Sequence, residues 1–151
     1  LLPIAHVVTP NLPEGAVLLA CSAPENVKQM RQMAEQLRRL LNQSSERWVY
    51  LKGGHLPSTG DGLCTDLLHN GDVMIELKSP RINTQNTHGT GCALSSALAA
   101  LLPQRANTTD AARAAHAWLA AAIAHSDTLN VGKGHGPVHH LHGLIRPVVQ
   151  R

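Results

Sequence analysis

The hydrophobic pattern alternates between short apolar runs and longer stretches in which apolar residues recur at helical spacing. The short runs are rich in Val, Ile and Leu and predict strands. They span residues 5–9, 48–51, 64–68 and 73–78. Residues 69–72 join the last two runs and contain Asn-Gly, which is typical of a hairpin turn. We therefore expect a hairpin there, and a loop at residues 56–63, where Pro and Gly are frequent.

Three longer stretches predict helices. They span residues 27–41, 93–102 and 111–126. In the first, Met30, Met33 and other apolar residues repeat opposite charged ones, so we expect an amphipathic helix of about five turns with its methionines in the core. The capping-box pattern of Ser22–Glu25 is expected to begin this helix, and Asn107–Asp110 is expected to cap the third. Pro103 should close the second.

Composition narrows the fold class. Of the 151 residues, 43% are hydrophobic but only 2% are aromatic and none is Phe, so Leu, Val, Ile and Ala must fill the core. Such a core suits a layered α/β domain better than an aromatic-rich β-sandwich. The formal net charge of +3 is small, and the basic residues are dispersed without an aromatic stacking platform. This pattern argues against a nucleic-acid partner.

The cysteines and the first residues bear on location. Cys21, Cys64 and Cys92 lie far apart and are odd in number, which predicts neither a disulfide framework nor a metal knuckle and favours a reducing, cytoplasmic setting. No apolar run approaches the ~20 residues of a membrane-spanning helix, and Leu1–Ile4 does not resemble a signal peptide. The chain begins without Met and leads directly into a strand pattern, so we expect it to begin in the middle of a domain.

The clearest candidate chemistry is the turn His88-Gly89-Thr90-Gly91-Cys92, which leads into the Ala/Leu-rich helix. Two glycines allow a tight turn and the close approach of a ligand. A helix that starts there presents free backbone N–H groups and the positive end of its dipole, which together favour a bound anion such as phosphate. The alternative, an ordinary glycine-rich loop before a buried helix, carries equal weight on this motif alone.

Two strand ends carry further polar groups. Asn11 and Glu14 follow the first strand and could converge on a hydrated Mg²⁺, although their spacing favours a capped turn before a helix. Lys52 follows the second strand, before two glycines, and could hold an ammonium over a phosphate; a solvated surface lysine is the simpler interpretation. The Gly- and His-rich stretch 132–142 lacks the carboxylates and spacing of a zinc site, and we interpret it as a glycine loop near a nucleotide.

Four separate segments occur together in the order found in one known family. They are Thr9-Pro10-Asn11-Leu12-Pro13-Glu14, Lys52-Gly53-Gly54-His55, Asn86-Thr87-His88-Gly89-Thr90-Gly91-Cys92 and Gly134-His135-Gly136-Pro137-Val138-His139-His140. The chain thereby closely resembles, from its first residue to about His142, the hydroxymethylpyrimidine/phosphomethylpyrimidine kinases of thiamine biosynthesis, which are ribokinase-like enzymes.

The resemblance implies a three-layer α/β/α sandwich and the ATP- and Mg²⁺-dependent phosphorylation of 4-amino-5-hydroxymethyl-2-methylpyrimidine and then of its monophosphate. It assigns Gly89, Thr90 and Gly91 to an anion hole and Cys92 to the catalytic position, where many ribokinase relatives have an aspartate. Cys92 would act as the base or would orient the substrate hydroxyl. The remaining assignments are ATP binding by Lys52, Thr87, His88 and Gly134, and water-mediated Mg²⁺ binding by Asn11 and Glu14.

The chain departs from the family in length. We expect residues 1–151 to be the C-terminal, ATP-side portion of one ribokinase-like domain whose N-terminal half holds most of the pyrimidine pocket. The chain alone is then expected to be inactive, and the full-length protein to be a cytoplasmic homodimer.

Other functions stay open on the sequence alone. A pyridoxal-type vitamin kinase would share the ATP-side motifs. A Cys–His hydrolase or thiol transferase would use His88 to activate Cys92. A non-catalytic nucleotide-binding module would bind ATP without turnover. A dinucleotide site is disfavoured, because Leu94 stands where the third glycine of that motif belongs.

Overall fold

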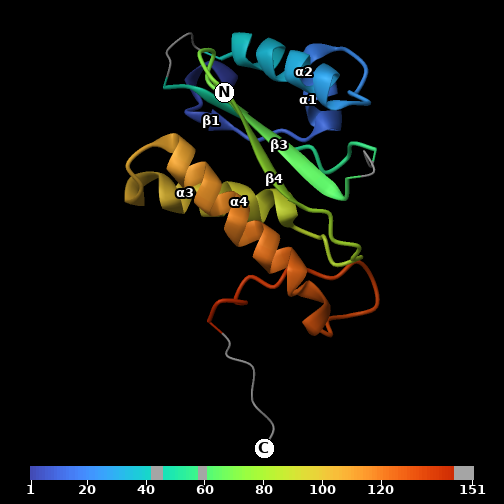
Figure 1. The fold of residues 1–151 in the computed structure, drawn as a ribbon. Coiled ribbons are helices and arrows are strands. Elements are labelled where there is room, and N and C mark those ends of the chain that lie inside the picture. Colours follow the sequence, from blue (N-terminus) through green and yellow to red (C-terminus); the bar gives the residue numbers. More distant parts are fainter. Residues whose placement is uncertain (42–45, 58–60, 145–151) are drawn as a thin grey trace, which may run out of the picture. The chain divides into compact units, whose positions relative to one another are not determined.

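The computed structural model describes residues 1–41, 46–57 and 61–144. The chain divides into two compact units, residues 1–81 and residues 82–151, and each is described by itself. Figure 1 follows the elements in chain order. Part of the predicted loop 56–63, at residues 58–60, lies outside the described residues.

The first unit contains a four-stranded mixed sheet. Its strands are β1 (Val7–Val8), β2 (Trp48–Leu51), β3 (Leu63–His69) and β4 (Met74–Pro80), in that order across the sheet. β1 runs parallel to β2, whereas β2 and β3, and β3 and β4, are antiparallel. All four predicted strands are confirmed. β1 is shorter than residues 5–9, because its pairing with β2 extends only over Val7 and Val8.

The hairpin between β3 and β4 is confirmed at the predicted turn. The Asn70 side-chain oxygen accepts the backbone N–H groups of Asp72 and Val73, at 3.1 and 2.9 Å. Gly71 has a φ of 104°, a conformation that favours glycine. From the neighbouring helix, Arg38 Nε donates to the Asn70 carbonyl at 2.7 Å. Local side-chain bonds and one long-range bond therefore fix this turn.

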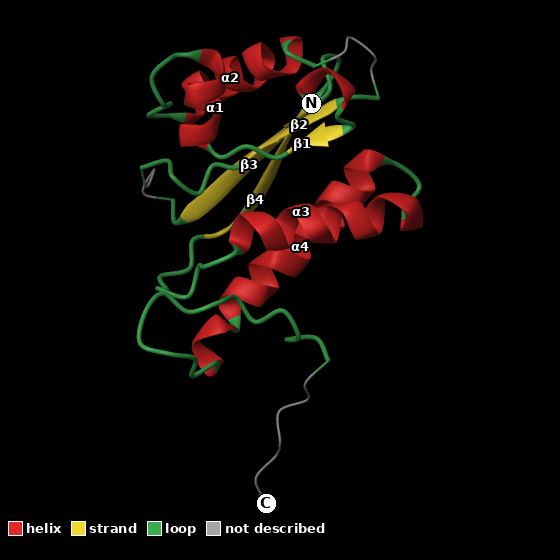
Figure 2. Ribbon diagram, turned by 180° about the vertical axis from the view of Figure 1, so that it is seen from behind, coloured by secondary structure: helices red, strands yellow, loops and turns green. Residues whose placement is uncertain are grey.

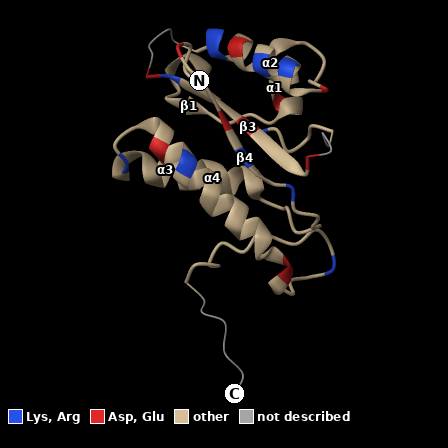
Figure 3. Ribbon diagram, viewed as in Figure 1, with Lys and Arg blue, Asp and Glu red and all other residues tan. Residues whose placement is uncertain are grey.

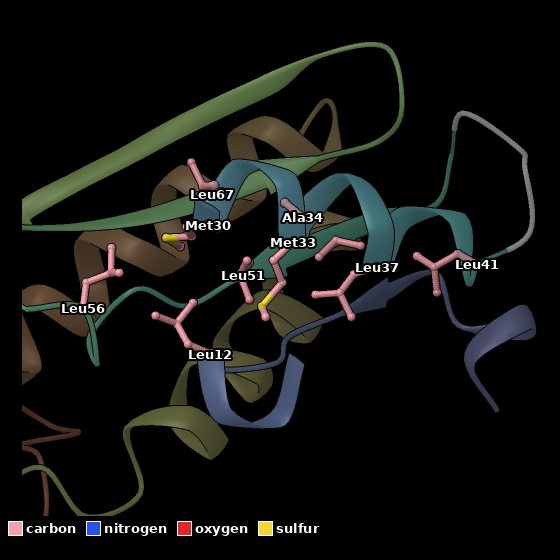
Figure 4. Close-up of a cluster of buried hydrophobic side chains, with 10 residues drawn as sticks. Leu12, Met30, Met33, Ala34, Leu37, Leu41, Leu51, Leu56 and Leu67 are labelled. Atoms are coloured by element: carbon pink, nitrogen blue, oxygen red, sulfur yellow. The ribbon is translucent and has the colours of Figure 1, made fainter. Parts of the chain in front are cut away.

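Two helices complete the first unit, after a short 3₁₀ turn, η1 (Leu2–Ile4). α1 (Leu12–Leu19) packs on α2 (Val27–Arg39), and α2 packs on β2 and β3. Figure 4 shows side chains of α2 lying among Leu12 of α1 and leucines of the strands. The predicted place of Met30 and Met33 in the core is confirmed, since they are 0% and 4% exposed.

The predicted start of α2 was wrong. Its N-cap is Asn26, whose side chain accepts the Gln29 N–H at 2.9 Å, and not the Ser22–Glu25 segment. The Gln29 side chain in turn accepts the Glu25 N–H at 2.8 Å. The helix has 13 residues and is therefore shorter than five turns. Its amphipathic character is confirmed, and Figure 3 shows basic and acidic residues interspersed along it.

The second unit is built on two helices, α3 (Thr90–Leu101) and α4 (Thr108–Ala124), which lie side by side (Figures 1 and 2). The 3₁₀ turns η2 (Leu102–Gln104) and η3 (Ser126–Thr128) follow them. Pro103 lies in η2, so α3 ends where predicted, although it begins three residues earlier than expected. The cap at Asn107 is confirmed, and its side chain accepts the Asp110 N–H at 2.8 Å.

Small residues allow the close packing of this unit. Ala111 and Ala115 on α4 are completely buried. A second cluster joins Ala93 of α3, Ala122 of α4 and Val138 of the following loop. In the parts of the chain that are described, no helix is long and apolar enough to cross a membrane.

Candidate functional site

The first group of predicted site residues meets where β1 and β2 end. Because these strands are parallel and adjacent, the segments that follow them emerge at the same edge of the sheet. The Lys52 N–H donates to the Pro10 carbonyl at 2.9 Å, and Asn11 and Lys52 form an isolated parallel bridge. The structure therefore brings Lys52 next to Asn11 and Glu14, which lie about forty residues earlier in the sequence.

Asn11 and Glu14 form a reciprocal capping box at the start of α1. Asn11 Oδ1 accepts the Glu14 N–H at 2.8 Å, and Glu14 Oε2 accepts the Asn11 N–H at 2.7 Å. The capped turn favoured by their spacing is thus confirmed. The Glu14 side chain is 57% exposed, and its Oε2 lies 3.9 Å from Lys52 Nζ. The Lys52 side chain is only 19% exposed and lies beside the capping box.

The turn after Lys52 is held by side chains that the sequence did not single out. Asp66, in the middle of β3, accepts the Gly53 N–H at 2.8 Å through Oδ1 and the Tyr50 hydroxyl at 3.1 Å through Oδ2. Burial, with a smaller contribution from Asp66, raises the pKa of Tyr50 far above its usual range, which keeps the phenol a donor. Arg81 donates to the carbonyls of Gly54 and Leu56, at 3.2 and 3.1 Å. An acidic residue within an otherwise apolar strand pattern is the sequence signal that could have identified Asp66.

In the second unit, the glycine turn forms the predicted helix start. Gly89 is the N-cap of α3 with φ 80° and ψ 4°, and no side chain caps the helix. The Thr90 N–H donates to the Thr87 carbonyl at 3.3 Å, and the Ala93 N–H to the Gly89 carbonyl at 2.8 Å. Between them, the Gly91 and Cys92 N–H groups have no hydrogen-bond partner within the described parts of the chain. These two amides at the positive end of the helix are ready to donate to an anion.

The loop before this turn is fixed by polar bonds to η3. Asn86 Nδ2 donates to Asp127 at 2.9 Å, and the Thr84 hydroxyl donates to the same carboxylate. The 134–137 segment packs on the same loop, because the His88 N–H donates to the Gly136 carbonyl at 3.1 Å. A Cβ on Gly136 would lie 2.1 Å from Asn86 Oδ1, so only glycine allows this approach. The last two motifs therefore lie side by side within one unit.

Cys92 is exposed and lies on the wall of an open groove of about 710 Å³. Residues of α3 and α4, including Ser96 and Trp118, line the groove together with His140. Trp118 and His140 have ring centroids 6.3 Å apart. His140 lies in the predicted Gly- and His-rich loop, whereas Trp118 was not a candidate, because a Trp in an alanine-rich helix is expected to pack in the core. The groove gives the Cys92 thiol access to molecules outside the protein.

One of the alternatives that the sequence left open gains no support from the geometry. No hydrogen bond joins the His88 imidazole to the Cys92 thiol among the described residues, as a Cys–His pair would need. The described ranges also hold no cluster of three or more His, Cys, Asp or Glu side chains arranged for a metal ion. The Gly134 loop and its histidines therefore do not form such a cluster.

Comparison with known proteins identifies the family. A family model described as phosphomethylpyrimidine kinase matches residues 1–139. The chain belongs to the phosphomethylpyrimidine kinase family. A hydroxymethylpyrimidine/phosphomethylpyrimidine kinase of Salmonella typhimurium is 48% identical over 142 residues, which cover 94% of this chain and 51% of that protein. The chain thus spans about half the length of the curated relatives that it matches.

Solved structures of pyridoxal kinases share the fold. An ADP complex of the Bacillus subtilis enzyme superposes with a TM-score of 0.81 at 32% identity, covering 92% of this chain and 51% of that one. A Staphylococcus aureus pyridoxal kinase in complex with AMP-PCP and pyridoxal gives 0.83 at 28% identity, covering 96% and 51%. The predicted α/β, ribokinase-like fold class is confirmed.

Proposed function

We propose that the full-length protein containing these 151 residues is an ATP-dependent kinase of thiamine biosynthesis. It would phosphorylate the hydroxymethyl group of 4-amino-5-hydroxymethyl-2-methylpyrimidine and then the resulting monophosphate. The observation that carries the proposal is the start of α3, where two amides without a hydrogen-bond partner among the described residues adjoin an exposed thiol. Membership in the phosphomethylpyrimidine kinase family supports the choice of substrate.

The backbone at this helix start suits phosphoryl transfer. The transferred group carries its charge on peripheral oxygens, so positioning and fixed donors matter more than covalent chemistry. The Gly91 and Cys92 N–H groups would donate to those oxygens, and Gly89 supplies the backbone conformation that leaves them free. The Thr90 amide, already bonded to the Thr87 carbonyl, would contribute less than the resemblance implies. Thr87, His88 and Gly134 would line the path of the nucleotide.

Lys52 and the capping box formed by Asn11 and Glu14 would bind the phosphate chain of ATP and its Mg²⁺. The confined Lys52 ammonium would offset phosphate charge as a point charge. Asn11 and Glu14 fit a hydrated Mg²⁺, because the capping box uses Glu14 Oε2 and leaves Oε1 without a hydrogen-bond partner in the described residues. Mg²⁺ commonly keeps several waters and takes one or two carboxylates beside substrate phosphates. When bound, the ion would neutralise charge on the phosphate oxygens.

Cys92 would face the hydroxyl that accepts the phosphoryl group. As a thiolate it would take the hydroxyl proton, and as a thiol it would orient the oxygen while the proton leaves late. Pyridoxal is the second candidate acceptor, favoured by the likeness to the Staphylococcus aureus kinase in complex with pyridoxal. Both acceptors carry a hydroxymethyl group on a heteroaromatic ring. The same ATP-side geometry would therefore suit either acceptor.

The test uses the full-length protein with ATP and each acceptor in turn, and mass spectrometry to identify the products. We expect mono- and diphosphorylated pyrimidine, and Cys92→Ala should lower kcat by more than it changes the KM for ATP. Cys92→Ser separates the two roles, since a hydroxyl can orient the acceptor but does not ionise near neutral pH. ATP binding without product would support a non-catalytic module, and an unchanged kcat in Cys92→Ala would remove this thiol from the chemistry.

Two further properties belong to the proposal. The three cysteines are free in the structure, which supports a cytoplasmic location. The family resemblance supports a homodimer of the full-length protein, which sedimentation equilibrium would measure.

A further inference from the structure

We infer that Asp66 is a positioning residue for Lys52, acting through the backbone of Gly53. The inference rests on the proposed role of Lys52 at the ATP phosphates. Asp66 belongs to β3 and has no part in the four motifs that carry the family resemblance. The residue is only 8% exposed, so its carboxylate is largely removed from water and depends on partners within the protein.

The two oxygens of Asp66 bind residues on either side of Lys52. Oδ2 accepts the hydroxyl of Tyr50, two residues before Lys52, and Oδ1 accepts the N–H of Gly53, directly after it. Tyr50 is completely buried. The direction of a peptide N–H fixes the peptide plane, and the plane between Lys52 and Gly53 sets the backbone angle ψ of Lys52. The Asp66–Gly53 bond therefore orients the residue that carries the ammonium.

The space around Gly53 shows how closely this turn is held. A Cβ on Gly53 would lie 1.8 Å from the Thr65 carbonyl oxygen, so the turn rests directly on β3. The Arg81 guanidinium donates to two carbonyls of the same turn, those of Gly54 and Leu56. Two side chains therefore hold the turn: Asp66 accepts from its Gly53 N–H, and Arg81 donates to its carbonyl oxygens. In front of it, Lys52 Nζ lies 3.9 Å from Glu14 Oε2.

The roles of the two oxygens can be separated by substitution. Asp66→Ala removes the acceptor of the Gly53 N–H, whereas Tyr50→Phe removes only the phenol donor and leaves that acceptor in place. Asp66→Asn keeps an oxygen that can accept from Gly53. If Asp66 only stabilises the core, variants with equal loss of melting temperature should have equal kinetics. If Asp66 positions Lys52, Asp66→Ala should raise the KM for ATP and leave the KM for the pyrimidine unchanged.

The kinetic experiment compares the three variants in the full-length protein. We expect Asp66→Ala to raise the KM for ATP on the order of ten-fold to a hundred-fold, as for a misplaced catalytic group, with the KM for the pyrimidine unchanged. Asp66→Asn should restore most of the affinity, and Tyr50→Phe should lower the melting temperature without this change in KM. Should Asp66→Ala not fold, Asp66→Ser replaces it, because its hydroxyl is one bond too short to reach Gly53. An unchanged KM for ATP, or an equal rise in Tyr50→Phe, overturns the inference.

Amide hydrogen exchange provides a readout that does not depend on activity. The Gly53 amide should exchange slowly in the wild-type protein and in Tyr50→Phe, and fast in the Asp66→Ala or Asp66→Ser variant. If the wild-type protein lacks kinase activity, the proposed function fails, and exchange alone then decides whether Asp66 holds the turn. Fast exchange at Gly53 in the wild-type protein would refute the inference whatever the activity.

Discussion

Replacing Gly89 by alanine isolates the backbone conformation at the start of α3. Gly89 has φ 80°, and a Cβ built there would have no heavy atom within 4 Å. The substitution therefore introduces strain without a steric contact. A left-handed conformation costs a non-glycine residue roughly 1–2 kcal/mol. Alanine also restricts the unfolded chain, which offsets about 0.4–1 kcal/mol of that cost. The net loss of stability should be about 1 kcal/mol.

The effect on activity should be larger than the effect on stability. If the strained residue relaxes towards negative φ, the first turn of α3 rotates and the Gly91 and Cys92 amides no longer point at the same place. Loss of one backbone donor to a charged transition state commonly lowers kcat by roughly 10²–10³-fold. We expect a decrease of this order in ATP-dependent phosphorylation by the full-length protein. A loss of about 1 kcal/mol should lower the melting temperature by only about 2–4 °C.

Gly62→Ala is the matched control. Gly62 has φ 70°, and a Cβ built there would likewise meet no heavy atom of the described residues within 4 Å. It lies in the loop before β3 and has no proposed role in catalysis. Both variants should lose similar stability, measured by thermal unfolding, and only Gly89→Ala should lose activity. Full activity in Gly89→Ala, or an equal decrease in both variants, would show that the amides at this helix start do not stabilise the transferred phosphoryl group.

The remaining predictions concern stability and thiol reactivity. Ala20 ends α1 in the left-handed conformation, at φ 51°, so Ala20→Gly should stabilise the protein by roughly 0.5–1 kcal/mol, measured by urea unfolding; a destabilised variant would contradict this. Burial and the neighbouring Asp66 raise the pKa of Cys64 to about 11, so its reaction with iodoacetamide should be negligible at pH 8 and should increase only as the pH approaches 11. The exposed Cys21 and Cys92 serve as internal references, and modification of Cys64 at their rate would refute this.

The sequence predicted individual elements well because their signals are local. The Asn-Gly hairpin, the cap at Asn107 and the strand before Lys52 each depend on a few neighbouring residues. The cap of α2 failed for the same reason. The prediction used the capping-box pattern at Ser22–Glu25 and did not consider Asn26, which caps the helix in the structure.

What the sequence could not predict is which segments meet. Asn11 and Lys52 are adjacent because β1 and β2 are parallel neighbours in the sheet. No local sequence pattern predicts that pairing. Asp66 binds Gly53, 13 residues earlier, and Asn86 binds Asp127, 41 residues later, and no local sequence pattern indicates either pairing. Family resemblance identified the motif residues, and the structure added the side chains that hold those motifs in place.

The two glycine motifs illustrate why similar sequences need separate physical explanations. Gly89 is required by its positive φ, with open space where a side chain would be, which is the space that a ligand needs. Gly53 is required by contact, because a Cβ would overlap the Thr65 carbonyl. In the proposed function, the first glycine would leave amides open to an anion, whereas the Gly53 amide is bonded to Asp66 and only the Lys52 side chain would reach the phosphates. One motif would bind phosphate through the backbone and the other through an ammonium that the backbone directs.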